Sequence, residues 1–507
     1  MLSRIHTAAM VGLDARMVEV EVDISPGLPG TLIVGLPDAA VKEARDRVRA
    51  AVRNSGCSFP LKRITINLAP ADLKKIGPTY DLPIAIGILV SSGQINIDCT
   101  DTLFLGELSL DGSLRHLNGI LPMVAMAREK GIHHVFVPAE DAREAGLIDE
   151  ITVYPVVALG QLVSHFQGEQ DIQPYSGNAT WEEQYHAGQQ DDISQVKGHE
   201  HAKRALEVAA AGGHNVLMVG PPGSGKTMLA RALANILPAL TLSEAIEVTR
   251  IYSVSGLTSR DNPLVCRRPF RSPHYSTSHA GLVGGGRLPH PGEISLSHRG
   301  VLFLDEFSEF NHMALESLRQ PLEDRIITIS RAEGSLTFPA NFILVAAMNP
   351  CPCGYYGDPV RECKCSSTVV TRYQKKISGP LMDRIDIFLD IPRVDYEKLT
   401  DDGHSESSDA VRGRVQAARH IQTGRFAGSA LTDNADMTAL EIRQFCKVDT
   451  QAQALLKTAM KQIHFTARAF HRTLKLARTI ADLDSSQIIK TNHVAEALQY
   501  RQRNINQ

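Results

Sequence analysis

A glycine-rich octapeptide at positions 220–227, GPPGSGKT, contains the residue types that bind phosphate. Its glycines let successive backbone N–H groups turn toward phosphate oxygens, its lysine can reach the β and γ phosphates, and its threonine hydroxyl is a ligand for Mg²⁺. The octapeptide consists of Gly220, Pro221, Pro222, Gly223, Ser224, Gly225, Lys226 and Thr227. This spacing predicts a binding site for ATP and Mg²⁺.

Three further polar side chains follow apolar runs of the sequence. Asp305 and Glu306 come directly after VLFL, and Asn349 comes after FILVAAM. Asp305 suits the coordination shell of Mg²⁺, and Glu306 can polarise the attacking water as a general base. Asn349 can orient water beside the γ phosphate. Because a buried strand that ends in carboxylates is costly unless a metal or nucleotide uses them, these residues predict the hydrolytic part of the site.

The apolar runs predict the elements that position these groups. NVLMVG at 215–220 is typical of a buried strand, and MLARALANIL at 228–237 is typical of a helix. Strand, loop and helix in this order are the context that the phosphate-binding motif requires, which argues against a chance glycine-rich turn. Since carboxyl ends of parallel strands meet at one edge of a sheet, three strand ends are expected to converge on one nucleotide.

Length and composition limit the class of protein. The chain has 507 residues, 43% of them hydrophobic, and a net charge of −3. This length suggests about three domains, and the charge excludes both a highly charged disordered chain and a globally basic nucleic-acid coat. The longest apolar stretch, near 82–90, is too short to span a bilayer, and the first residues lack a signal-peptide core. We expect a cytoplasmic protein with no membrane partner.

Two acidic stretches divide the chain and predict linkers at 171–195 and 395–410. The expected domains are therefore 1–170, 196–394 and 411–507. The last of these has 15 Lys or Arg against 7 Asp or Glu. This excess predicts either a module that faces a polyanion or a helical bundle with solvated basic faces.

Four of the eight cysteines crowd into one short segment and form two C-x-C pairs: Cys351, Cys353, Cys363 and Cys365. Four thiolates can complete a tetrahedral zinc shell, although one residue within each pair is fewer than the common two to four. The alternative is a set of free thiols in a reducing compartment. Because the segment begins two residues after Asn349, zinc here would brace the end of a strand and take no part in chemistry.

The motifs together resemble AAA+ ATPases, in which Asn349 occupies the position called sensor 1. The segments FRSPHYSTSHAGLVGGG at 270–286 and GPLMDRIDI at 379–387 are similar to the magnesium-chelatase-like branch of these enzymes. This resemblance implies that Arg384 is an arginine finger, which a neighbouring subunit presents to ATP. The alternative is a surface arginine paired with an adjacent aspartate.

The segment TARAFHRTLKLARTIADL at 466–483 resembles the sensor 2 helix of the same proteins. The resemblance implies that Arg468 contacts the γ phosphate. Arg472 lies one helical turn later and is the competing assignment. The segment belongs to the α-helical lid that we expect at the carboxyl end of the chain.

Two insertions resemble elements that touch DNA in ring-shaped relatives such as the replicative minichromosome maintenance helicases. The segment at 270–286 resembles the helix 2 insert. IITIS and SLTF flank RAEG, which predicts a β-hairpin like the one before sensor 1. The resemblance makes Arg331, at the tip, a candidate DNA contact, although Glu333 offsets its charge.

The amino-terminal segment at 106–141 resembles the proteolytic domain of Lon proteases. That family uses a serine nucleophile and a lysine base, and a hydroxyl without its nearby amine is not activated. Alignment places Thr79 near the serine and Leu121 at the lysine. We therefore expect a Lon-protease-like fold (ribosomal protein S5 domain 2-like) without the catalytic dyad.

The order of these parts in one multidomain α/β chain resembles the ComM/YifB family over essentially its full length. The resemblance implies a homo-hexameric ring that hydrolyses ATP while moving along single-stranded and branched DNA. Such a helicase promotes branch migration of homologous recombination intermediates during natural transformation. The alternative is a chelatase-like remodelling ATPase that acts on a protein partner, since its core motifs would be the same.

Overall fold

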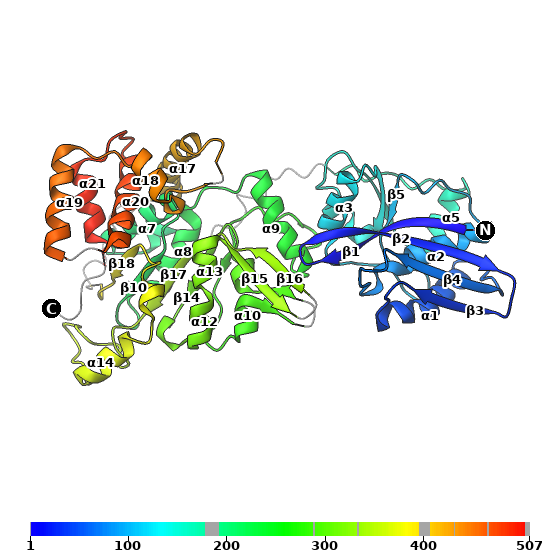
Figure 1. The fold of residues 1–507 in the computed structure, drawn as a ribbon, viewed down its shortest axis with the longest axis horizontal. Helices are drawn as coiled ribbons and strands as arrows, with labels where there is room; N and C mark the ends of the chain where they lie inside the picture. Colours follow the sequence, from blue (N-terminus) through cyan, green and yellow to red (C-terminus); the bar gives the residue numbers. More distant parts are fainter. Residues whose placement is uncertain are drawn as a thin grey trace. The chain divides into compact units, whose positions relative to one another are not determined.

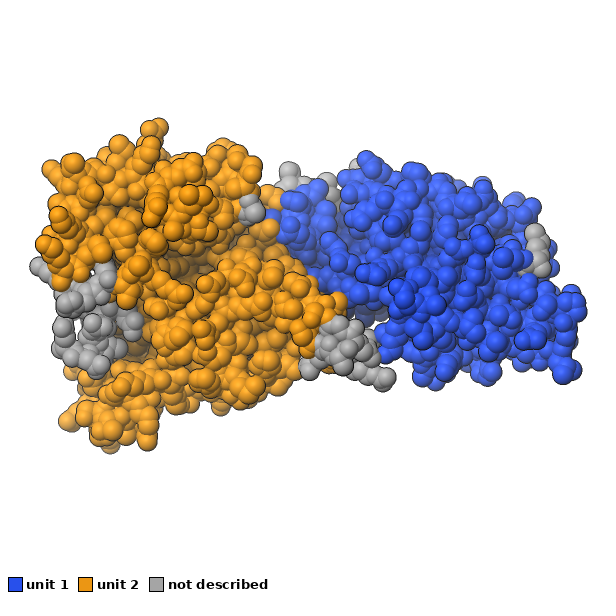
Figure 2. Space-filling view, viewed as in Figure 1, with its two compact units in different colours: residues 1–182, 242–265 blue, residues 183–241, 266–507 orange. Residues whose placement is uncertain are grey.

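Two large β-sheets, one of seven strands and one of five, organise the computed structural model of the chain (Figure 1). The structure describes residues 2–177, 192–286, 289–331, 334–394, 406–429, 431–463 and 466–501. The chain groups into two units, which Figure 2 colours separately. Unit 1 contains residues 1–182 and 242–265, and unit 2 contains residues 183–241 and 266–507.

Unit 1 is built on the mixed seven-stranded sheet. In spatial order its strands are β3 (Gly30–Val34), β4 (Arg63–Ala69), β2 (Asp14–Ser25), β1 (Leu2–Val11), β5 (Thr102–Phe104), β8 (His134–Pro138) and β9 (Thr152–Val156). A small hairpin pairs β6 (Glu107–Leu108) with β7 (Leu114–Arg115). The helices are α1 (Ala39–Asn54), α2 (Asp81–Ser91), α3 (Ile120–Glu129), α4 (Ala142–Ala145), α5 (Leu159–Phe166) and α9 (Leu242–Val254).

Apolar side chains on the two faces of the seven-stranded sheet give unit 1 two apolar cores. Ile5 and Val20 belong to a cluster that includes residues of α1 and α2, whereas Ala8 and Met17 pack into a second cluster with residues of α3. Successive side chains of a strand point to opposite faces, so helices cover both sides of the sheet. The apolar run at 82–90 lies in α2, which is buried almost all round. No helix in the described part of the chain is long and apolar enough to cross a membrane.

Residues 242–265, which we expected within the domain at 196–394, group with unit 1. Helix α9 packs against α3, and its Ser253 hydroxyl donates a hydrogen bond of 2.6 Å to the buried Glu144. Burial raises the pKa of Glu144, and the hydrogen bonds from Ser253 and the Leu121 N–H oppose this rise. Arg250 adds an ion pair of 2.8 Å with Asp14. A buried carboxylate needs such partners, which explains the attachment of this segment.

Unit 2 is built on the five-stranded sheet, in which all neighbouring strands are parallel. Its strands, in spatial order, are β11 (Phe270–Arg271), β14 (Val301–Leu304), β17 (Ile343–Met348), β10 (Val216–Val219) and β18 (Ile387–Asp390). Every residue of β14 and β17 is buried, as expected for inner strands covered on both faces. A mixed α/β unit with a parallel sheet agrees with the predicted AAA+ class.

Helices surround this sheet and continue into a helical region at the carboxyl end (Figure 1). They are α7 (Glu200–Gly212), α8 (Lys226–Ile236), α10 (His279–Val283), α11 (Glu293–Leu296), α12 (His312–Ser317), α13 (Arg319–Asp324), α14 (Ser367–Gln374), α15 (Gly379–Met382), α17 (Ser408–Arg425), α18 (Ala439–Phe445), α19 (Thr450–Ile463), α20 (Ala467–Leu483) and α21 (Thr491–Gln499). One apolar cluster joins residues of the sheet to residues of α17 and α20. The carboxyl-terminal helices therefore share a core with the sheet.

The hairpin predicted around RAEG is present as β15 (Ile326–Arg331) and β16 (Gly334–Pro339), which pair antiparallel. The glycine-rich insertion forms α10 and a short pair of strands, β12 (Gly284–Gly285) and β13 (His290–Pro291). The side chain of Arg331 lies outside the described part of the hairpin, so its contact with DNA stays a prediction. The two acidic stretches also fall largely outside the described residues.

Candidate nucleotide-binding site

The predicted phosphate-binding loop connects the carboxyl end of β10 to the start of α8. Gly223 and Gly225 have φ angles of +75° and +87°, in the left-handed region that favours glycine. The carbonyl oxygen of Ser224 lies 3.0 Å from Nε2 of His199, a buried residue that the motif did not reveal. The Ser224 hydroxyl is itself buried and has no hydrogen-bond partner among the described residues.

Lys226 is folded back onto its own loop. Its Nζ donates hydrogen bonds of 2.8 Å and 2.9 Å to the carbonyl oxygens of Gly220 and Pro221, and it lies 3.4 Å from the side-chain oxygen of Asn349. Burial lowers the pKa of Lys226, while the Asp305 carboxylate opposes this effect. These acceptors are all neutral, and a buried ammonium group makes stronger hydrogen bonds with the charged oxygens of a phosphate.

The two expected Mg²⁺ ligands, Thr227 and Asp305, come together across the sheet edge. The Thr227 hydroxyl donates a hydrogen bond of 3.3 Å to the Asp305 carboxylate. The N–H of Glu306 donates to the other Asp305 oxygen at 2.8 Å, and Glu306 itself has a φ of +51°. A hydroxyl and a carboxylate oxygen are the hard ligands that Mg²⁺ prefers, so this pair fits the ion.

The four clustered cysteines also converge. Their Sγ atoms all lie within 4.8 Å of one another, and the distances from Cys351 to Cys353 and to Cys363 are 3.3 Å and 3.7 Å. Four thiolates around one zinc ion, with Zn–S bonds of about 2.3 Å, would lie about 3.8 Å apart, so the donor set fits this metal. The segment also touches the phosphate-binding loop, since a Cβ added to Gly354 would meet Pro222 at 2.7 Å.

Arg384 and Arg468 line a different cleft of unit 2. The cleft includes Asn215, which precedes β10, whereas the phosphate-binding loop follows β10. Four strand residues extend about 13 Å, so the two arginines lie at the edge of the sheet opposite their own phosphate-binding loop. Arg384 donates a hydrogen bond of 2.7 Å to the Pro380 carbonyl and contacts the carboxylate of Glu323.

Arg472 is engaged in positioning the segment that carries Arg384. Its guanidinium group donates a hydrogen bond of 2.6 Å to the Ile385 carbonyl and lies 3.3 Å from the Asp383 carboxylate. Arg468 is exposed, and no hydrogen bond or ion pair involves it within the described residues. This difference favours Arg468 over Arg472 for contact with a phosphate.

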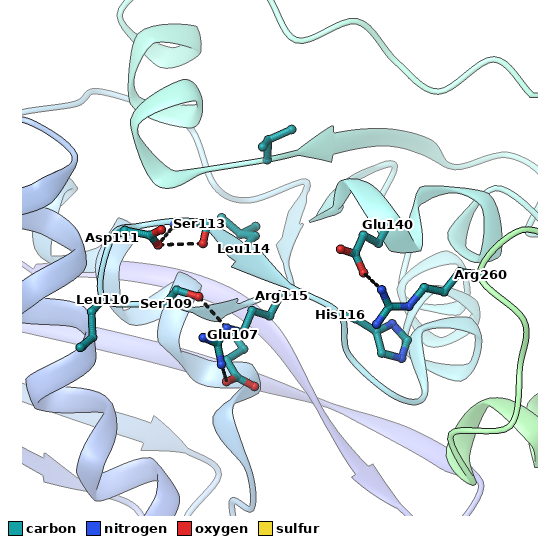
Figure 3. A pocket seen from close by; sticks show the side chains of 11 residues that line it. Glu107, Ser109, Leu110, Asp111, Ser113, Leu114, Arg115, His116, Glu140 and Arg260 are labelled. Carbon is teal, nitrogen blue, oxygen red and sulfur yellow. Dashed lines mark hydrogen bonds and ion pairs between the residues drawn. The ribbon is translucent and has the colours of Figure 1, made fainter.

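The segment at 106–141 contributes to a pocket of about 980 Å³ in unit 1 (Figure 3). Two ion pairs lie in this pocket, since Arg260 lies 2.8 Å from Glu140 and Arg115 lies 3.8 Å from Glu107. The Asp111 carboxylate accepts a hydrogen bond of 2.7 Å from the Ser113 hydroxyl. The described residues that line it include no lysine that could activate a hydroxyl. Leu121, which the sequence comparison predicted at the lysine position of Lon proteases, is fully buried in the apolar core.

Comparison with known proteins defines the class of this site and fold. Three family models match the chain: "Subunit ChlI of Mg-chelatase" at 20–141, "Magnesium chelatase, subunit ChlI" at 192–399, and "Magnesium chelatase, subunit ChlI C-terminal" at 405–501. Together with the parallel sheet and the nucleotide-binding geometry, they define a magnesium-chelatase-like AAA+ protein. Membership of this class implies ATPase activity with ATP and Mg²⁺.

The chain belongs to the ComM/YifB family. It is 44% identical over 505 residues to the uncharacterized protein YifB of Escherichia coli and 42% identical over 505 residues to the competence protein ComM of Haemophilus influenzae. Both alignments cover 99% of this chain and 97% of the relative. A more distant similarity, 25% over 270 residues, relates 49% of this chain to 27% of the DNA helicase MCM8 of Xenopus laevis.

Proposed function

We propose that this protein is an ATP-driven motor that moves along single-stranded and branched DNA. The observation that carries the proposal is the convergence of Lys226, Thr227, Asp305 and Asn349 at one sheet edge, in a chain that resembles a competence protein over its full length. The distant similarity to a DNA helicase supports the same substrate class. Branch migration of recombination intermediates during natural transformation is the cellular role we infer.

The chemical roles follow from the positions of the side chains. We infer that Lys226 and the loop N–H groups bind the phosphates, that Thr227 and Asp305 hold Mg²⁺, and that Glu306 activates the attacking water. The ion would neutralise charge that develops on the phosphates. Asn349 lies near enough to Lys226 to orient that water beside the γ phosphate.

The placement of Arg384 and Arg468, at the sheet edge opposite the phosphate-binding loop, supports a ring. Arg384 and Arg468 are too far from the phosphate-binding loop of their own chain to act there, so each would contact the nucleotide of a neighbouring copy. Such head-to-tail contacts close into a ring when the rotation between copies allows it. We therefore propose a homo-hexamer in which Arg384 is the arginine finger and Arg468 is sensor 2.

Steady-state ATP hydrolysis with and without DNA tests the proposal. We expect single-stranded and branched DNA to stimulate hydrolysis several-fold, and the stimulation to fall as salt rises, because phosphate contacts are salt-sensitive. The Glu306→Gln variant serves as the blank. Robust hydrolysis that is indifferent to DNA at every salt concentration would contradict the DNA motor and favour remodelling of a protein partner.

We also propose that the four cysteines hold structural zinc. Because Gly354 lies against Pro222, the metal would keep the cysteine segment in place against the phosphate-binding loop. We expect about one equivalent of zinc per purified chain, and Cys363→Ser should lower both the zinc content and, several-fold, the affinity for ATP. Less than about half an equivalent, undisturbed by chelator, would refute the site, whereas loss of zinc with unchanged ATP affinity would refute its connection to the loop.

For unit 1 we propose a Lon-protease-like fold that has lost its peptidase chemistry. The burial of Leu121, and the lack of lysine among the described residues that line the Figure 3 pocket, support this assignment. Thr79 lies in a short 3-10 turn just before α2. A threonine hydroxyl needs a nearby base to act as a nucleophile, and Leu121 at the aligned lysine position cannot supply one.

A further inference from the structure

The exposed face of α14 combines hydroxyl groups with positive charges. The helix buries Val370 and Tyr373 on its inner side. A shallow groove of about 610 Å³ follows its outer side and is lined by Ser367, Thr368, Thr371, Arg372, Lys375 and Lys376. All of these except Thr371 are exposed, and none of them is acidic.

Two of the three cations in this groove have no partner within the described residues. The side chains of Arg372 and Lys375 form no ion pair or hydrogen bond there. Lys376 differs, because its Nζ lies 3.1 Å from the Glu309 carboxylate and 5.2 Å from the centre of the Tyr373 ring. The groove therefore keeps positive charge that the described neighbouring side chains do not neutralise.

We propose that this face of α14 binds the phosphate backbone of nucleic acid. Lysine, arginine, serine and threonine side chains make the sequence-independent phosphate contacts that hold proteins on nucleic acids. The seven helical steps from Ser367 to Gln374 cover about 10 Å, and Lys375 and Lys376 follow directly after the helix. This length is enough to meet more than one phosphate of a strand.

The proposal rests on the DNA-motor function and adds a contact to it. In Figure 1, α14 lies at an edge of unit 2 well away from the hairpin β15–β16, where the sequence places Arg331. A second contact outside the hairpin would hold DNA by charge and would not read its sequence.

Equilibrium binding of full-length protein to a fluorescent single strand of about 30 nucleotides, measured at several salt concentrations, tests the groove. The double variant Arg372→Ala/Lys375→Ala should bind about tenfold more weakly, and its dependence on the logarithm of salt should be shallower by about 1 to 2. Basal ATP hydrolysis should not change, since neither residue belongs to the nucleotide site.

Two further variants make the result specific. Arg128→Ala/Lys130→Ala removes the same charge from exposed positions of unit 1 and should leave binding unchanged. Arg372→Lys/Lys375→Arg keeps both charges and should bind like the wild type. Loss of binding in this conservative variant would assign the two side chains a structural role and overturn the proposal.

The remaining outcomes separate this proposal from the function on which it rests. If the wild type binds the strand and the alanine double variant binds equally well with the same salt dependence, only the α14 proposal fails. If the wild type itself does not bind nucleic acid, and DNA does not stimulate its ATP hydrolysis, both proposals fail.

Discussion

Replacing Lys226 with alanine is expected to weaken ATP binding by about 100-fold or more, because charge-assisted hydrogen bonds to a phosphate are lost from a buried site. In the free protein the Lys226 ammonium group is already desolvated and hydrogen-bonded to two loop carbonyls. The phosphates of ATP would replace these neutral acceptors with charged ones. Titration of the variant with a fluorescent ATP analogue in the presence of Mg²⁺ measures the loss.

The Glu306→Gln variant is the matched control for this prediction. Glu306 is exposed and follows the strand end, and glutamine keeps its size while removing the base. We expect ATP binding to be retained and hydrolysis to fall by about 10²- to 10⁴-fold, so that bound ATP accumulates. Equal loss of binding in the Lys226 and Glu306 variants would contradict the separate roles of phosphate ligand and general base.

Arg384→Ala should lower the rate of ATP hydrolysis by about 10³-fold or more, an effect comparable to that of Glu306→Gln, while each chain still binds ATP. The reason is geometric: Arg384 lies at the sheet edge opposite its own phosphate-binding loop, so in the proposed ring it would serve the nucleotide of another copy. Its present contacts, with Glu323 and the Pro380 carbonyl, would be exchanged for the γ phosphate when copies assemble.

Mixing the two inactive variants tests action between copies. Arg384→Ala chains supply an intact phosphate-binding loop, and Lys226→Ala chains supply an intact Arg384. If the copies mix at random in equal amounts, roughly a quarter of the interfaces combine both, so about a quarter of wild-type hydrolysis should return. Each variant alone sets the baseline. No recovery, despite proof by cross-linking that mixed assemblies form, would argue against an arginine finger acting between copies.

Much of the nucleotide site could be predicted because its parts are local. Lys226 and Thr227 are adjacent residues at the start of a helix, and Asp305 and Asn349 each follow a buried strand. The rule that parallel strands end at one edge then predicts their meeting. In the structure Lys226 contacts Asn349, and Thr227 contacts Asp305. His199 was not predicted, because a lone histidine far from a motif gives no signal in a sequence.

The cysteine segment could be predicted only in part. The spacing of Cys351, Cys353, Cys363 and Cys365 predicted that four thiols could meet, and they do. No sequence pattern predicted that Gly354 lies against Pro222. The two residues are 132 positions apart, and only packing brings them together.

The sequence by itself determined the class of the fold and the candidate residues of the site, because strand, loop and helix motifs set positions a few residues apart through the covalent chain. Only the tertiary structure decided where distant parts belong. It placed Arg384 and Arg468 in one cleft away from their own phosphate-binding loop. It also showed that Arg472 binds the Ile385 carbonyl, next to Arg384. Residues 242–265 belong to unit 1, where Ser253 contacts the buried Glu144. Such choices depend on which apolar faces and buried charges find partners over long separations, and no local spacing encodes them.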